Sequence, residues 1–255
     1  MKPTPDDPDR HFRPPAQDRL FLPRDPDRLF LPRDPDRLFL PPDDDLAPNR
    51  PGETLRTFLA EHPLDGPALL GARLLGRRPV QDDWRRRLAA ESAVGAELER
   101  LGRGGWHVLH SLPLPSGSEI SHLLIGPGGV FCLATEAVRG ARVRADATDV
   151  HPGYGRRPQP YVRRTRQRAV RATYALTRGC GFPVPVHPVL VLVGPRCIEQ
   201  LPEEQEAGAH CEPEVRLVAG AQAVMALGTL GGVLAPAAVD RIHTVARNRR
   251  TWNDL

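Results

Sequence analysis

Apolar residues recur at two different periods along the second half of the chain, and these periods predict its elements. Residues 84–101 and 161–179 repeat apolar positions at helical spacing, and glycines end both segments. Shorter apolar runs between turn residues predict strands at 106–114, 119–126, 130–136, 141–146, 187–194 and 215–220. The run at 187–194 is continuously apolar, which is typical of a strand buried on both faces. Further helices are expected near 221–228 and 236–250.

The order of these elements predicts the fold class. Three strands follow one another closely over residues 106–136, which indicates an antiparallel meander. A helix, the buried strand, another strand and two more helices come next. This order predicts an α/β fold, with a mixed sheet flanked by helices.

The first fifty residues have a different composition. They hold twelve of the 29 prolines, nine basic and eleven acidic residues. The sequence DPDRLFLPR at 25–33 returns as DPDRLFLPP at 34–42, and a shortened copy lies at 18–24. We therefore expect residues 1–50 to be disordered and 51–81 to be a linker with short helices, so that the folded domain spans 82–255. Alternatively, the RLFL repeats could recruit a protein partner by avidity.

The cysteines and the N-terminus indicate the compartment. The four cysteines are far apart and form no CxxC pair, which argues against a zinc ribbon or a disulfide scaffold. The N-terminal residues contain no apolar stretch that could serve as a signal peptide, so a cytoplasmic protein is expected. Residues 217–239 lack charge, but a glycine pair and Pro236 interrupt them, and we expect no membrane span.

Positive charge is concentrated in one part of the chain, although the net charge is only +4. Residues 150–198 contain no Asp or Glu. In the helix predicted at 161–179, an apolar stripe should face the core: Val162, Ala169, Thr173 and Leu176. Candidate phosphate-binding arginines follow the other face: Arg163, Arg164, Arg168 and Arg171. DNA or RNA is therefore a candidate partner, and a solvated basic surface is the alternative.

Several segments taken together resemble the nuclease-related domain (NERD) family in its actinobacterial form. They are GAELERL, GWHVLHSLPL, SHLLIGPGGVF, the RG at 139–140, YVRRTRQRAVRA, FPVPVHPVLVLV and IHTVARNRRTW. The resemblance covers roughly residues 85–252. It implies a PD-(D/E)XK core, like that of restriction endonucleases, and descent from a Mg²⁺-dependent enzyme that cleaves DNA.

The resemblance also implies a metal site built from a helix glutamate, a strand aspartate and an acidic-x-Lys strand. Glu97 matches the helix glutamate, whereas Ser121 and Ala134 stand at the two acidic positions and Glu136 stands at the lysine. A hydroxyl is a poor Mg²⁺ ligand, so a pseudoenzyme without a cofactor is expected. The alternative is a nuclease whose Mg²⁺ is held by relocated carboxylates, namely Glu97, Glu119 and Glu136.

Overall fold

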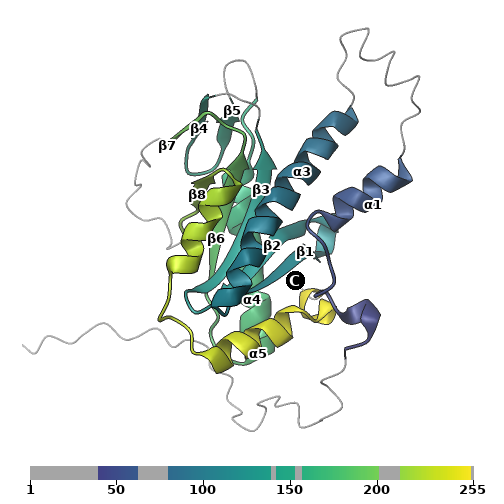
Figure 1. Ribbon diagram of the computed structural model, residues 1–255, viewed down its shortest axis with the longest axis vertical. Coiled ribbons are helices and arrows are strands. Elements are labelled where there is room, and N and C mark those ends of the chain that lie inside the picture. Colours follow the sequence, from purple (N-terminus) through teal and green to yellow (C-terminus); the bar gives the residue numbers. More distant parts are fainter. Residues whose placement is uncertain (1–39, 63–79, 139–141, 153–156, 201–212, 254–255) are drawn as a thin grey trace, which may run out of the picture. The chain divides into compact units, whose positions relative to one another are not determined.

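The computed structural model describes residues 40–62, 80–138, 142–152, 157–200 and 213–253. The larger of its two sheets has five strands in the order β1–β2–β3–β6–β8 (Figure 1). These strands are β1 (His107–Pro113), β2 (Glu119–Gly126), β3 (Gly129–Ala137), β6 (Val186–Val193) and β8 (Arg216–Ala219). The first three are antiparallel, and β6 and β8 continue the sheet parallel to β3. The predicted meander and the predicted buried strand are confirmed.

A smaller sheet has three strands in the order β5–β4–β7. They are β4 (Arg142–Ala145), β5 (Val150–Pro152) and β7 (Cys197–Gln200). Only β4 is predicted by the sequence pattern. The other two strands are three and four residues long, which is too short for an alternation of apolar and polar residues to stand out.

Helices cover both faces of the larger sheet, as the fold class predicts. On one face, α3 (Val80–Glu99) and the 3-10 helix η6 (Ala221–Thr229) pack on apolar residues of β2, β3 and β6. In Figure 1, α3 crosses in front of the strands. On the other face lie α4 (Tyr161–Cys180) and α5 (Pro236–Ala246). The segment near 221–228 is thus a 3-10 helix, and α5 ends earlier than predicted, before the short helix η7 (Arg249–Trp252).

The segment before α3 is part of the fold from residue 40 onward, which the composition does not predict. Leu46 is fully buried and packs in one core with Trp252, and its N–H donates to the Arg247 carbonyl at 2.8 Å. The helix α1 (Glu53–Glu61) follows and packs on α3. A Cβ at Gly95 would lie 2.4 Å from Pro51 Cγ, so the glycine lets this segment approach α3 closely.

The described part therefore moves the predicted boundaries at residues 50 and 82. A buried leucine and its backbone pairing with the C-terminal segment anchor residues that proline and charge would otherwise mark as unstructured. Residues 1–39, with nearly all of the repeats, and residues 63–79 lie outside the described part of the chain. None of the described helices is both long enough and apolar enough to cross a membrane.

Candidate functional site

A group of polar side chains is buried where α3 meets the ends of β2 and β3. Glu91 of α3, Ser121 of β2 and Glu136 of β3 expose only 2%, 5% and 7% of their surface. The Ser121 hydroxyl donates a hydrogen bond of 3.4 Å to Glu91 Oε1. The antiparallel pairing of β2 and β3 reaches His122 and Leu133, so Ser121 and Ala134 come next on each strand. The structure thus brings these strand positions of the predicted site together.

Burial raises the pKa of both carboxyl groups, Glu91 and Glu136, above the ordinary value. Burial, followed by the charge of nearby Glu119, raises the pKa of Glu91 to about 7. Burial also raises the pKa of Glu136. Arg87 opposes both shifts, and its Nη2 lies 3.9 Å from Glu136 Oε1. A guanidinium of the protein itself therefore provides positive charge beside these carboxyl groups.

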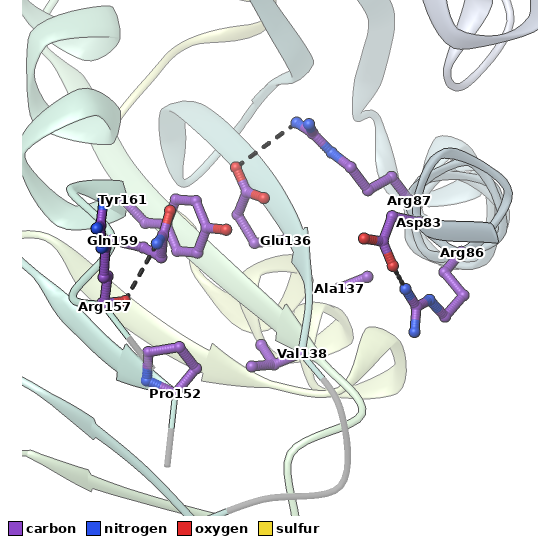
Figure 2. A pocket seen from close by; sticks show the side chains of 10 residues that line it. All are labelled: Asp83, Arg86, Arg87, Glu136, Ala137, Val138, Pro152, Arg157, Gln159 and Tyr161. Carbon is purple, nitrogen blue, oxygen red and sulfur yellow. Dashed lines mark hydrogen bonds and ion pairs between the residues drawn. The ribbon is translucent and has the colours of Figure 1, made fainter. Parts of the chain in front are cut away.

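Glu136 lines a cavity of about 560 Å³ between α3 and the start of α4. Figure 2 shows its carboxylate between Arg87 and the ring of Tyr161. Burial raises the pKa of Tyr161, and the charge of Glu136 adds to that shift. Arg86 forms an ion pair with Asp83 at the edge of the cavity. The lining of this cavity therefore contains acidic side chains, arginines and the phenol of Tyr161.

The predicted helix glutamate, Glu97, lies elsewhere on α3. It pairs with Arg100 at 2.9 Å, and six residues separate it from Glu91, which turns the two side chains about 120° apart around the helix. Glu91 is the glutamate beside Ser121, and the resemblance did not identify it. The sequence does contain a sign of this role, because Glu91 occupies a position on the apolar stripe of the predicted helix. Glu119 accepts a hydrogen bond of 2.6 Å from the Thr54 hydroxyl of α1.

The side chains at this site do not fit Mg²⁺, the ion that the resemblance implies. Magnesium takes oxygen ligands in octahedral geometry, usually carboxylates and water. Ser121 offers a hydroxyl and Ala134 offers no donor, so these two strand positions provide no carboxylate ligand. Within the ranges that the structure describes, no three His, Cys, Asp or Glu side chains could hold a metal ion together.

The helix α4 presents the arginine face that its sequence predicts. Val162, Ala169 and Leu176 are buried, while Thr173 is half-buried and its hydroxyl accepts from the Val186 N–H at 3.1 Å. Three of the four predicted arginines are exposed, namely Arg163, Arg164 and Arg171. The fourth, Arg168, is half-buried. Arg166 differs from them, because its guanidinium donates to the carbonyls of Pro213 and Ala147.

A second cavity, of about 370 Å³, lies beside this face. The arginines Arg164, Arg168 and Arg171 line it together with Gln167 of α4. The turn between β1 and β2 contributes Gly117 and Ser118 from the other side. None of the described residues that line this cavity is acidic, in contrast to the first cavity.

Comparison with protein families gives a match to part of the chain. The family model of the nuclease-related domain (NERD) matches residues 86–193. This range runs from α3 to the end of β6, so it contains the buried Glu91, Ser121 and Glu136 and the whole arginine face of α4. No curated protein and no solved structure matches the chain.

Proposed function

We propose that this protein, whose residues 86–193 form a nuclease-related domain, binds nucleic acid through α4 and has lost metal-dependent cleavage. The proposal rests above all on one observation: three arginines of one helix face line a cavity in which none of the described lining residues is acidic. Guanidinium groups bind phosphate oxygens through paired N–H donors, and this recognition does not depend on base sequence.

Loss of cleavage is supported by the chemistry of the buried group. A phosphodiesterase of this kind needs a cation that activates water and offsets charge on the phosphate. The position of the family's lysine holds Glu136, whose carboxylate would repel a phosphate. Ser121 and Ala134 replace two acidic ligands. We propose that the domain keeps the nuclease-like fold and uses it for binding. A cytoplasmic setting remains part of this proposal and rests on the spacing of the cysteines.

The binding half is tested by titrating labelled duplex DNA with the full chain at several salt concentrations. Replacing Arg164, Arg168 and Arg171 with Gln should weaken binding to unrelated sequences equally. Each phosphate contact contributes a slope of about −0.9 to the dependence of log affinity on log salt, so the slope should flatten by roughly three units.

A matched control removes three exposed arginines that lie outside α4. The control chain carries Gln at Arg103, Arg196 and Arg216, and therefore has the same net charge as the test variant. It should keep most of the affinity and slope. Equal losses in both variants would mean that the chain binds DNA only through its overall charge, and the assignment to α4 would be wrong.

The cleavage half is tested with plasmid and single-stranded DNA in Mg²⁺ or Mn²⁺. We expect no turnover by the purified chain. Turnover that disappears in Glu91→Ala or Glu97→Ala would contradict the proposal and would support a nuclease with relocated carboxylates. The two variants distinguish the glutamate beside Ser121 from the one that pairs with Arg100.

A further inference from the structure

The arginine-lined cavity, which we call the oxyanion cleft, has a defined set of donors. Arg164, Gln167, Arg168 and Arg171 occupy positions i, i+3, i+4 and i+7 of α4, so they share one face of the helix. The opposite wall is the turn from β1 to β2, where Gly117 has a φ of +68°. That left-handed conformation is readily adopted by glycine, and it shapes the tight turn before Ser118.

No acidic side chain is among the described residues that line the cleft. Arg168 is half-buried, and the charges of Arg164 and Arg168 lower the pKa of the Glu136 carboxyl. Glu136 lies in the other cavity and already faces Arg87. The charges of Arg87, Arg164 and Arg168 thus act on the same carboxylate. An anionic ligand in the cleft would offset the charge of its arginines, because a cation that is partly removed from water gains from an opposite charge nearby.

A neutral donor adds to the arginines. The Ser118 hydroxyl is buried and makes no hydrogen bond to any part of the chain that the structure describes. A hydroxyl can rotate to suit a partner, and buried polar groups in proteins are normally paired. The Gln167 amide lies on the same lining. Guanidinium and amide groups therefore line the cleft, and the Ser118 hydroxyl can join them as a donor when its side chain turns out of its buried position.

We propose that the oxyanion cleft holds the terminal phosphate of a nucleic-acid strand, that is, a phosphomonoester. A monoester carries close to two negative charges at neutral pH and has three terminal oxygens, which can meet three guanidinium groups. An internal phosphodiester has one charge and two free oxygens. The inference rests on the proposed function and makes it specific, because it turns a general affinity for nucleic acid into recognition of a strand end.

The test compares single-stranded oligonucleotides of one sequence that end in a 5′-phosphate, a 3′-phosphate or only hydroxyls. The full chain should bind one phosphorylated form about tenfold more tightly, as expected for one additional charge-assisted hydrogen bond. Inorganic phosphate at millimolar concentration should compete away that preference and leave hydroxyl-ended binding largely intact.

Two variants assign the preference to the cleft. Arg168→Gln and Ser118→Ala should each lose most of the preference for the phosphorylated end, whereas Arg103→Gln, an exposed arginine on another element, should keep it. Circular dichroism of each variant confirms that it is folded. Arg171→Gln, at an exposed position, provides a second test if Arg168→Gln fails to fold.

The outcomes separate the two proposals. Equal binding of all three oligonucleotides would overturn the terminal-phosphate assignment and leave nucleic-acid binding in place. Binding of inorganic phosphate by a chain that binds no oligonucleotide would overturn both proposals, since the cleft would then serve a small phosphate compound. A preference that survives in Arg168→Gln and Ser118→Ala would place the phosphate outside the cleft and would also contradict the assignment.

Discussion

Glu91→Gln is expected to stabilise the folded protein above neutral pH, because the native state holds this carboxyl at an unfavourable site. Its pKa rises from 4.5 to about 7 on folding, mainly through burial. The folded chain therefore binds this proton more tightly than the unfolded chain. Stability is lost as pH rises from about 4.5 to about 7, and the loss is complete above that range. At 1.36 kcal/mol for each pKa unit, the full loss is about 3 kcal/mol.

Glutamine removes this loss and keeps the shape of the side chain. At pH 8 the variant should gain up to about 3 kcal/mol in urea unfolding, or roughly 6–12 °C in melting temperature for a domain of this size. At pH 4 the two chains should differ little. Glu97→Gln is the matched control, and it should change stability by less than about 1 kcal/mol because its pair with Arg100 is partly exposed. The quantity to compare is the stability gained by Glu91→Gln over the native chain. If this gain is no larger at pH 8 than at pH 4, the reasoning is refuted.

Two further variants test the packing. Leu46→Ala should lower the free energy of unfolding by about 2–5 kcal/mol, measured by urea titration, because Leu46 is fully buried; a change below 0.5 kcal/mol would mean that the segment is not part of the core. Arg166→Gln should cost about 1–3 kcal/mol, since it leaves the carbonyls of Pro213 and Ala147 without their donor. Arg163→Gln is its control and should stay within about 0.5 kcal/mol.

The regular elements of the larger sheet could be predicted because their signals are local. The unbroken apolar run at 187–194 is enough to predict a buried strand, and the glycines at 126–129 are enough to predict a hairpin turn. The short strands β5 and β7 depend instead on pairing with β4, a contact between distant parts of the chain. Leu46 is a similar case. Its neighbours suggest disorder, and only the C-terminal segment that covers it makes its burial favourable.

The candidate site shows the same division. The positions of Ser121 and Glu136 follow from strand order, so the sequence could place them near one another. The choice between Glu91 and Glu97 depends on which side of α3 faces the sheet. The resemblance of short segments indicates where the helix lies in the sequence, but not which of its residues point toward the sheet. Arg166 could not be separated from its neighbouring arginines either, because the carbonyls that it binds belong to distant segments.

The negative charge of Glu136 should weaken the binding of DNA to the neighbouring arginines. Glu136→Gln should therefore increase the affinity for DNA. The charges of Arg164 and Arg168 lower the pKa of this carboxyl, so the three groups lie near enough to interact. Two unit negative charges separated by, for illustration, about 8 Å repel each other by about 2 kcal/mol at an effective dielectric constant of about 20, and salt reduces this further. We therefore expect duplex DNA to bind about 3- to 10-fold more tightly to the variant at low salt.

The dependence on pH separates this repulsion from a general change in net charge. Burial raises the pKa of Glu136, so protonation at falling pH should strengthen DNA binding by the native chain over a range in which Glu136→Gln changes little. Glu97→Gln removes the same charge from a position that pairs with Arg100, and it should leave both the affinity and its pH dependence as they are. If Glu97→Gln and Glu136→Gln raise the affinity equally, the effect belongs to net charge. The Glu136 carboxylate would then have no direct influence on phosphate binding.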